Sequence, residues 1–349
     1  MMCERPTPGG PPRVVATATP GGSKVWLVTG YQDVRAGLAD PRLSRDTRAA
    51  AHLIEGCGFD GQALRALPVE LADSLLRNES ADRLRRLAAD VFTAGRVESL
   101  RPRIAALAMD LIAPLRDRRA VDLVAEIARP LPVRLTCELL GLPASDKTLS
   151  WTEILLAVHD RTGLPGYLNE IADSQLVEAL AATDATADEM LNLVTMLVVG
   201  GVEIAGGFVA NAMSALLESP HRVALARHEP AMLPDLVAEL VRRSDPLHVG
   251  TFRCTTAPIR FGDTVIPAGE VVMLAGTDCP SDRHDAGTLG HGMQYRIGTL
   301  LGRVLAETVL ELLVVEFPEL RLAVPADQVP WQFTRLSRAV ERLPVMTGV

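Results

Sequence analysis

The sequence predicts a mainly α-helical fold, built as one large domain with small β-sheets late in the chain. Two observations lead to this prediction. Several segments longer than ten residues carry apolar side chains at intervals of three and four, which is the period of an amphipathic helix. Residues 252–276 instead alternate Thr, Val and Ile between Gly-Asp and Pro-Ala-Gly turns, which is typical of short strands.

The expected elements follow one another without an internal repeat or a clear interdomain linker. Pro41 should end the first helix, and the helix of residues 121–141 should bend or break at Pro130 and Pro132. We expect a strand at 23–30 and helices at 31–41, 79–92, 97–115, 121–141, 190–217 and 233–244, then the strands of 252–276 and a helix at 299–317.

The apolar segment 190–217 is the most membrane-like part of the chain. It contains Asn192, Glu203 and Asn211 and stops before Pro220, so we interpret it as the buried central helix of a water-soluble protein. The first residues lack an apolar signal core, which predicts a cytoplasmic protein. Residues 1–24 are rich in Pro and Gly and are expected to be flexible, with one domain over 25–349.

Composition excludes some classes of function. The chain of 349 residues is 48% hydrophobic, which is enough for a large core. A net charge of −8 and an aromatic content of 4% argue against a nucleic-acid-binding surface. The five cysteines are scattered without a CxxC pair, which predicts neither a disulfide framework nor a cysteine metal site, and fits a reducing compartment.

Several segments, in order, resemble the cytochrome P-450 family of haem-thiolate monooxygenases in its soluble bacterial form. Glu239 and Arg242 match the Glu-x-x-Arg pair of that family, which implies a structural role for both. The other matching segments are WLVTGYQDVRAGLADPRLS, RLRRLAADVFTAGRVESLRPRI, VDLVAEIARPLPVRLTCELLGLPASD, RCTTAPIRFGDTVIPAGE and RAVERLPV. The resemblance covers most of the chain from Val25 onward and implies the P-450 fold.

The stretch LGHGMQYRIGTLLGR, residues 289–303, resembles the haem-ligand loop of this family, whose signature is Phe-Gly-x-Gly-x-His-x-Cys-x-Gly. Leu289 stands in the Phe place and Gln294 in the His place. Arg296 stands where the family has the cysteine that binds the haem iron. The positions that match the signature and the helix after it are Gly290, Gly292, Gly298, Gly302 and Arg303.

Arginine at the ligand position predicts that the chain binds no haem. Its guanidinium stays protonated and has no lone pair for a metal, whereas a cysteine thiolate supplies the electron density that drives O–O cleavage. Cys279 lies upstream of the glycines and is a poor substitute.

Other positions depart from the family in the same direction. Ile204 replaces the threonine beside the acid Glu203, and Ala81 replaces a histidine that pairs with a haem propionate. Arg253, at another propionate-pairing position, remains, and we interpret it as structural. The segments for the substrate lid (residues 146–188) and for the meander before the loop (residues 276–288) are short, as is the N-terminus.

Few residues are left as candidates for other chemistry. Glu203 is expected to mark either a residual pocket together with Arg296 or a packed, hydrogen-bonded remnant of the family site. No metal site is expected, because the spacing of His284, His291 and the nearby aspartates matches no standard set of ligands. No catalytic or cofactor-binding residue is therefore predicted.

These observations predict a non-catalytic protein that resembles the haem-less P-450-like auxiliary proteins of actinobacterial polyketide pathways. The resemblance implies a partner, a deoxysugar glycosyltransferase of antibiotic biosynthesis, which such a protein would stabilise in its active form, as a hetero-oligomer without nucleic acid or membrane. One alternative is a cofactor-free enzyme of the same fold that uses Glu203 and Arg296 in the emptied cavity. Another is a redundant paralogue or a recruitment platform for a carrier protein.

Overall fold

The structure is a computed structural model, and its contacts divide the chain into two compact units. One unit comprises Met1–Cys57 with Gly250–Gly290, and the other comprises Gly58–Val249 with His291–Val349. The domain expected for residues 25–349 is thus made of parts of both units. The structure describes residues 14–18, 24–44, 82–143, 153–154, 157–158, 163–243, 251–274, 293–333 and 338–348.

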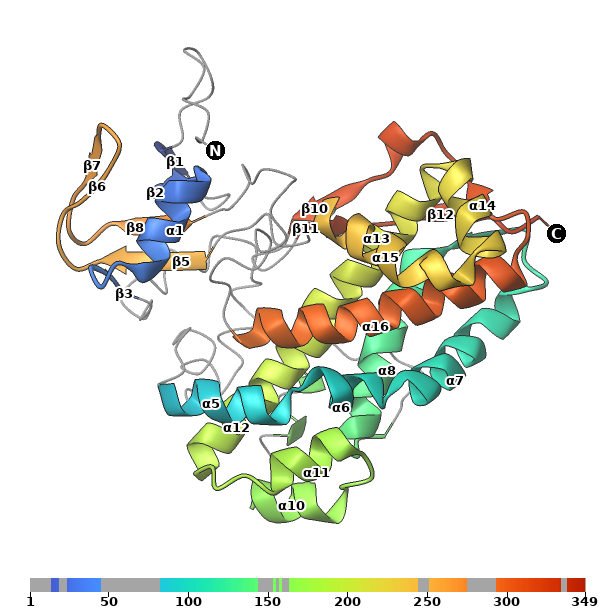
Figure 1. The fold of residues 1–349 in the computed structure, drawn as a ribbon, viewed down its shortest axis with the longest axis horizontal. Helices are drawn as coiled ribbons and strands as arrows, with labels where there is room; N and C mark the ends of the chain where they lie inside the picture. The colour runs from blue at the N-terminus through green and yellow to red at the C-terminus, as the bar shows by residue number, and fades with distance from the viewer. Residues whose placement is uncertain are drawn as a thin grey trace. The chain divides into compact units, whose positions relative to one another are not determined.

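The first unit is built on a five-stranded sheet in the order β1-β2-β8-β5-β3 (Figure 1). Strands β2 and β8 pair in parallel, and the other neighbours pair antiparallel. Helix α1 and the hairpin β6–β7 complete the unit. The bounds are β1 Val14–Ala18, β2 Lys24–Val28, α1 Tyr31–Ala39, β3 Leu43–Ser44, β5 Thr251–Thr255, β6 Ile259–Phe261, β7 Thr264–Ile266 and β8 Val271–Leu274.

The predicted strands of residues 252–276 are confirmed as β5 to β8, because their Val, Ile and Leu side chains form a small core. Val28, Val272, Leu274 and Ile266 are fully buried in it. Strand β1 was not expected. It lies within residues 1–24, which were predicted to be flexible, and it pairs along its whole length with β2. The described part of the sheet therefore begins at Val14.

The second unit is the helical body of the protein. It also holds the small sheets β4-β12-β9 and β10-β11. Its strands are β4 Ala120–Asp122, β9 Arg321–Leu322, β10 Trp331–Phe333, β11 Arg338–Val340 and β12 Pro344–Met346. Its α-helices are α5 Asp82–Val91, α6 Ala94–Glu98, α7 Arg101–Ile112, α8 Pro130–Leu139, α10 Leu164–Glu170, α11 Gln175–Ala181, α12 Ala187–Val198, α13 Ala205–Leu217, α14 Pro220–His228, α15 Leu233–Arg243 and α16 Met293–Glu316.

Short helical segments of other types join these elements. The 3₁₀ turns are η2 Ala113–Leu115, η5 Pro230–Met232 and η7 Ala326–Gln328, and the π-helical segments are η3 Val124–Ala128 and η4 Val199–Ile204. The break predicted at Pro130 is confirmed, whereas Pro132 lies in the first turn of α8 and does not break the helix. The π-helical turn of η3 ends before Pro130, and Pro130 takes the first position of α8, where its missing N–H costs no hydrogen bond.

The central helix of this unit runs continuously through α12, η4 and α13, from Ala187 to Leu217. It starts at a capping box, in which Thr186 Oγ1 accepts from Glu189 N and Glu189 Oε2 accepts from Thr186 N. The helix is long and apolar enough to cross a membrane, and 83% of its most apolar window is buried inside the protein. This burial is what the core helix of a soluble protein shows.

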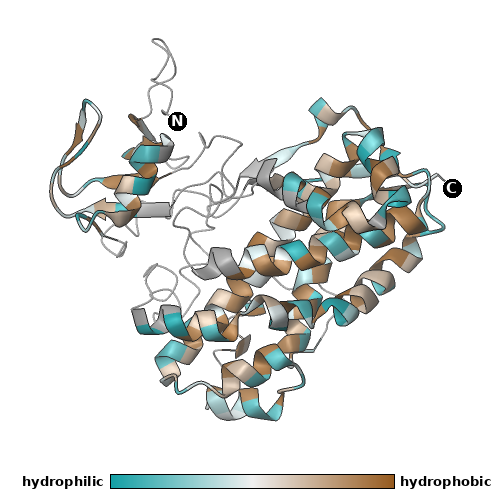
Figure 2. Ribbon diagram, in the orientation of Figure 1, coloured by the Kyte–Doolittle hydropathy of each residue, from teal (hydrophilic) through white to brown (hydrophobic). Residues whose placement is uncertain are grey.

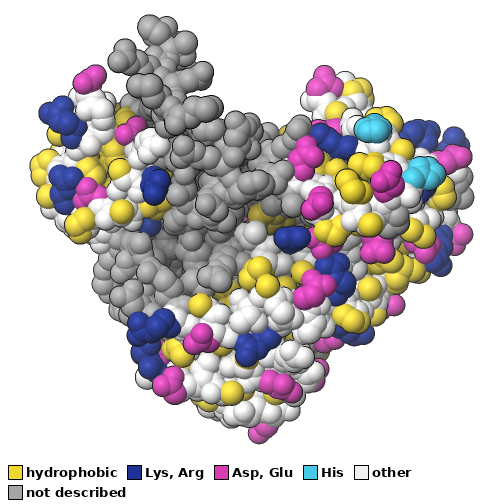
Figure 3. Space-filling view, viewed as in Figure 1, with side chains coloured by type: hydrophobic (Ala, Val, Ile, Leu, Met, Phe, Trp, Pro, Cys, Tyr) yellow, Lys and Arg dark blue, Asp and Glu magenta, His cyan; other side chains and the backbone are white. Residues whose placement is uncertain are grey.

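Helix α16 crosses the central helix and packs against it over η4 and α13, with α7 also in contact (Figure 1). It begins at Met293, six residues before the helix start that the sequence predicted. Figure 2 shows many apolar residues along both helices. These residues are buried because other helices cover them. In Figure 3, positive and negative side chains are mixed on the visible face of the helical unit.

The capping box of the central helix gives a test of this fold. Thr186→Ala should lower the free energy of unfolding by about 1 kcal/mol, because the N–H of Glu189 loses its acceptor. Thr186→Ser keeps the hydroxyl and should keep most of the stability. Urea unfolding followed by circular dichroism measures both variants, and an equal loss in the serine variant would argue against the capping role.

Candidate functional site

The region around Gly298 brings α16 into direct contact with the central helix. A Cβ atom at Gly298 would lie 2.5 Å from Ile204 Cγ2 and 2.9 Å from the carbonyl oxygen of Gly200. One turn later, a Cβ atom at Gly302 would lie 2.8 Å from Phe208 Cβ. Real Cβ atoms do not approach this closely, so the two glycines permit the crossing of the helices.

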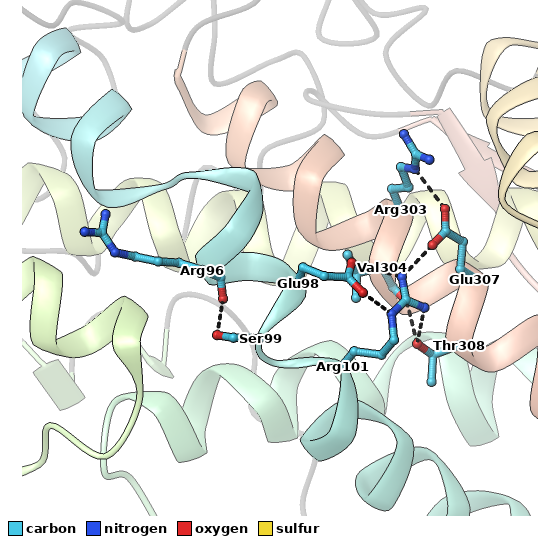
Figure 4. Close-up of polar contacts among 8 residues, drawn as sticks. All are labelled: Arg96, Glu98, Ser99, Arg101, Arg303, Val304, Glu307 and Thr308. Carbon is cyan, nitrogen blue, oxygen red and sulfur yellow. Dashed lines mark hydrogen bonds and ion pairs between the residues drawn. The ribbon is translucent and has the colours of Figure 1, made fainter.

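A cluster of charged side chains lies on the opposite side of α16 (Figure 4). Gly298 and Glu307 are nine residues apart, which is two and a half turns at 3.6 residues per turn. Glu307 is only 5% exposed, and its two oxygens bind different arginines. Oε2 accepts from Arg101 Nη2 at 2.6 Å, and Oε1 accepts from Arg303 Nε at 2.8 Å.

Arg101 connects three helices through this cluster. It is the first residue of α7 and pairs with Glu98 at the end of α6, through Nε and also through Nη2 at 3.0 Å. It also donates through Nη1 to Thr308 Oγ1 at 3.3 Å, while that hydroxyl donates to the Val304 carbonyl at 2.8 Å. The same guanidinium therefore ties α6 and α7 to α16.

Local sequence positions Glu98 and Arg101 for this role. Thr93 caps α6 by accepting from Arg96 N. At the other end of this short helix, Ser99 Oγ donates to the Arg96 carbonyl at 2.7 Å (Figure 4). Glu98 and Arg101 then stand three residues apart across the turn between α6 and α7.

The cluster shifts the pKa values of its members in the direction that keeps the ion pairs. Hydrogen bonding to Glu98, opposed by burial and helped by Glu307, raises the pKa of Arg101. Hydrogen bonding to Arg101 lowers the pKa of Glu98, although partial burial acts in the opposite direction. Both groups stay charged at neutral pH.

The structure brings only some of the sequence-predicted residues together. Ile204 is 2% exposed and fills the contact with Gly298, and Glu203 is half-buried beside it on η4. Glu239 is half-buried on α15. Arg253 is 2% exposed on β5 of the other unit, so it is not placed relative to this site.

The remaining predicted residues are described in part or not at all. The backbones of Gln294 and Arg296 belong to the first turn of α16, and that of Arg242 belongs to α15, but their side chains lie outside the described residues. Ala81, the glycines before Met293, Cys279 and the shortened meander also lie outside them. A residual pocket formed by Glu203 and Arg296 therefore stays a prediction.

Comparison with known proteins decides the family. No family model matches the chain, but curated relatives match it almost from end to end. Cytochrome P450 107B1 of Saccharopolyspora erythraea is 33% identical over 95% of this chain and 91% of its own length. The chain belongs to the cytochrome P450 superfamily. Its mainly helical fold with small sheets is the cytochrome P450 fold, as predicted.

Two other cytochromes P450 are named for their activity. The mycinamicin IV hydroxylase/epoxidase of Micromonospora griseorubida is 32% identical over 94% of this chain and 90% of its own length. The solved structure of the tirandamycin C-bound P450 monooxygenase TamI is 32% identical in sequence and superposes with a TM-score of 0.71. The match covers 97% of this chain and 92% of the TamI chain.

These relatives contradict four expectations from the sequence. The expected non-catalytic activator, the expectation of a non-enzyme, the description as a haem-less glycosyltransferase auxiliary protein, and the expected lack of haem are all overturned. The relatives are named as monooxygenases and hydroxylases, and the family points to haem. The expectation rested on Arg296 together with Ile204, Ala81 and the shortened segments, whereas the similarity to active relatives extends over almost the whole chain. The glycosyltransferase partner is untested and stays a prediction from sequence.

The described residues do not fit a thiolate-ligated haem, so no reaction step is derived through that group. Position 296 lies inside a helical turn and holds arginine, and its register, seven residues before Arg303 and eleven before Glu307, places it on the face of the charged cluster. Ile204 occupies the contact between the central helix and Gly298 on the other face.

The described cysteines do not replace the ligand. Cys137 is buried on α8, and burial raises the pKa of its thiol, which disfavours the thiolate that a metal needs. Cys254 lies on β5 of the other unit. Among the described residues, no group of three or more His, Cys, Asp and Glu side chains is placed to hold a metal ion.

Sequence reasoning did not single out the charged cluster. Arg303 was recognised only as a match to the family helix, although its i,i+4 spacing to Glu307 and the i,i+3 spacing of Glu98 to Arg101 were visible signals. Such pairs are common on solvated helix faces. Only the burial of Glu307 and the reach of Arg101 between helices distinguish these.

The glycine contact gives a second test. Gly298→Ala should lower the free energy of unfolding by about 1–3 kcal/mol, because the new methyl group overlaps Ile204 and the Gly200 backbone. Gly95 in α6 is the matched control, since a Cβ atom there meets nothing within 4 Å. Gly95→Ala should leave stability unchanged or raise it by about 0.5–1 kcal/mol. Equal effects at both positions would contradict the close crossing of α16 and the central helix.

The pair of Glu98 and Arg101 predicts a dependence of stability on pH. The pKa of Glu98 is lower in the folded state, so its stabilising effect is present above the unfolded pKa and is lost as the pH falls through the folded one. Glu98→Gln should therefore lower the urea midpoint at pH 7 and have a vanishing effect well below the usual glutamate pKa of about 4.3.

The control for this measurement is Glu229→Gln, at an exposed glutamate that makes no ion pair with a described residue. It should change the midpoint little at either pH. A difference between wild type and Glu98→Gln that persists in acid would contradict an electrostatic role for Glu98.

Proposed function

We propose that the chain is an oxidising enzyme of the cytochrome P450 type that inserts one oxygen atom into a polyketide-type natural product in the bacterial cytoplasm. The observation that carries the proposal is the similarity to cytochromes P450 over more than nine-tenths of the chain. The net reaction takes O₂, two electrons from an external reductant and two protons, and yields the hydroxylated or epoxidised product and water.

The substrate class follows from the names of two relatives. One is a hydroxylase and epoxidase of mycinamicin IV, and the other is a monooxygenase that holds tirandamycin C. We infer a related substrate, a bulky polyketide-type molecule, for this chain. Mycinamicin IV and tirandamycin C are therefore the probes for activity.

The axial ligand of the haem is the part of this function for which the sequence departs from the family, because Arg296 replaces the cysteine. Arginine cannot bind iron, so Arg296 does not supply the axial ligand of a haem. A thiolate at this place would supply the electron density that favours O–O cleavage. Arg296→Cys restores the family residue and is the sharpest comparison that the chain offers.

The experiment measures haem content and product formation in the purified protein after expression with added haem. The wild type should hold haem and convert at least one probe to a product heavier by one oxygen atom, in the presence of a surrogate electron donor. Arg296→Cys should add the absorbance signature of a thiolate-ligated haem in the reduced carbonyl complex and should raise turnover.

Two results would overturn the proposal. Absence of haem and of product in both proteins would show that the chain lacks the activity of its family. Haem and turnover in Arg296→Cys alone would show that the scaffold is competent while the natural chain is not an oxygenase.

A further inference from the structure

We propose that Glu307, through Arg101, is the positioning residue that presses the first half of α16 against the central helix. This inference goes beyond the proposed function and holds with or without haem. It rests on two contacts, on opposite faces of the same helix, that the structure places within the stretch from Gly298 to Thr308.

The first contact is steric. At Gly298 and Gly302, α16 touches the backbone of Gly200 and the side chains of Ile204 and Phe208. This face has no side-chain atoms of its own at either glycine, so dispersion contacts there are set by how closely the two helices approach. A small displacement of α16 would lose them.

The second contact is ionic and lies half a turn away around the helix. Because each oxygen of Glu307 is bound by a different arginine, the carboxylate has one fixed orientation. Arg303 belongs to the same helix as Glu307, so that pair stiffens α16 but cannot position it. Arg101 belongs to α7, so its bond to Glu307 fixes the distance between α16 and the α6–α7 corner.

Because Glu307 is buried, breaking the bond between Arg101 and Glu307 would cost free energy. A carboxylate that is 5% exposed has lost most of its water, so losing Arg101 would leave it poorly solvated. Thr308 accepts a further bond from the same guanidinium, which adds a second point of attachment on the adjacent residue of α16.

Position 296 lies on the same face, seven residues before Arg303, so the ionic contact also sets where the family ligand position stands. Glu307 therefore acts at a distance on the site, through the placement of α16. It is not assigned any contact with substrate or cofactor.

The test is a double-mutant cycle between the two faces of α16. Glu307→Gln removes the charge that pulls on Arg101, and Gly298→Ala adds the methyl group that needs space at the central helix. If Glu307 presses α16 inward, the drop in urea midpoint caused by Gly298→Ala should shrink to about half or less in the Glu307→Gln background.

A merely local stabilising role would give a different result. Sites on opposite faces with no shared partner add, so the Gly298→Ala drop would then be the same in both backgrounds. Full additivity overturns the proposal. The matched control is Glu98→Gln, which removes another partner of Arg101 but leaves the bond to α16, and it should leave the Gly298→Ala drop unchanged.

A second variant covers the case in which Glu307→Gln does not fold. Arg101→Met with Glu307→Met replaces both charges by apolar side chains of similar length, a change that buried ion pairs often tolerate. Its combination with Gly298→Ala should again show the reduced drop. Hydrogen exchange in the same proteins should rise at the amides of residues 294–303 before it rises in α13, and a uniform rise would also overturn the proposal.

Discussion

The close crossing of α16 and the central helix is the constraint on which the helical unit depends. Two glycines one turn apart let α16 approach the π-helical segment η4 and α13 to contact distance. This crossing joins α16, a helix of 24 residues, to the continuous central helix of 31 residues, and other helices pack on both. A side chain at either glycine would push the two helices apart. The packing of the core around them therefore requires glycine at both positions.

The charged cluster complements this apolar contact from the other side of α16. Dispersion between helices acts only at short range, whereas the bond between Arg101 and Glu307 holds its two helices at one distance in one orientation. The two glycines allow α16 to approach the central helix closely. The ion pair fixes the position of α16 relative to α7. The family ligand position lies on this same helix, so the geometry of the site and the stability of the body are coupled.

Arg296 illustrates how a substituted ligand position can mislead, even when other departures such as Ile204 and Ala81 agree with it. Its chemistry is certain, because a guanidinium does not bind iron. The conclusion drawn from it, a haem-less and non-catalytic protein, did not follow, since relatives with oxygenase names match the chain almost throughout. Family membership is a property of the whole pattern of buried and turn positions, and a few substitutions change that pattern little.

The sequence by itself determined the class of fold, the central helix, the break at Pro130 and the late strands. Each follows from a local rule, the period of apolar residues or the chemistry of proline and glycine. Only the tertiary structure decided the pairing of β1 with β2, the early start of α16 and the burial of Glu307. These depend on which distant segments meet. Glu307 has the same local spacing as a solvated surface pair, and it is distinguished only by Arg101, 206 residues away in the chain.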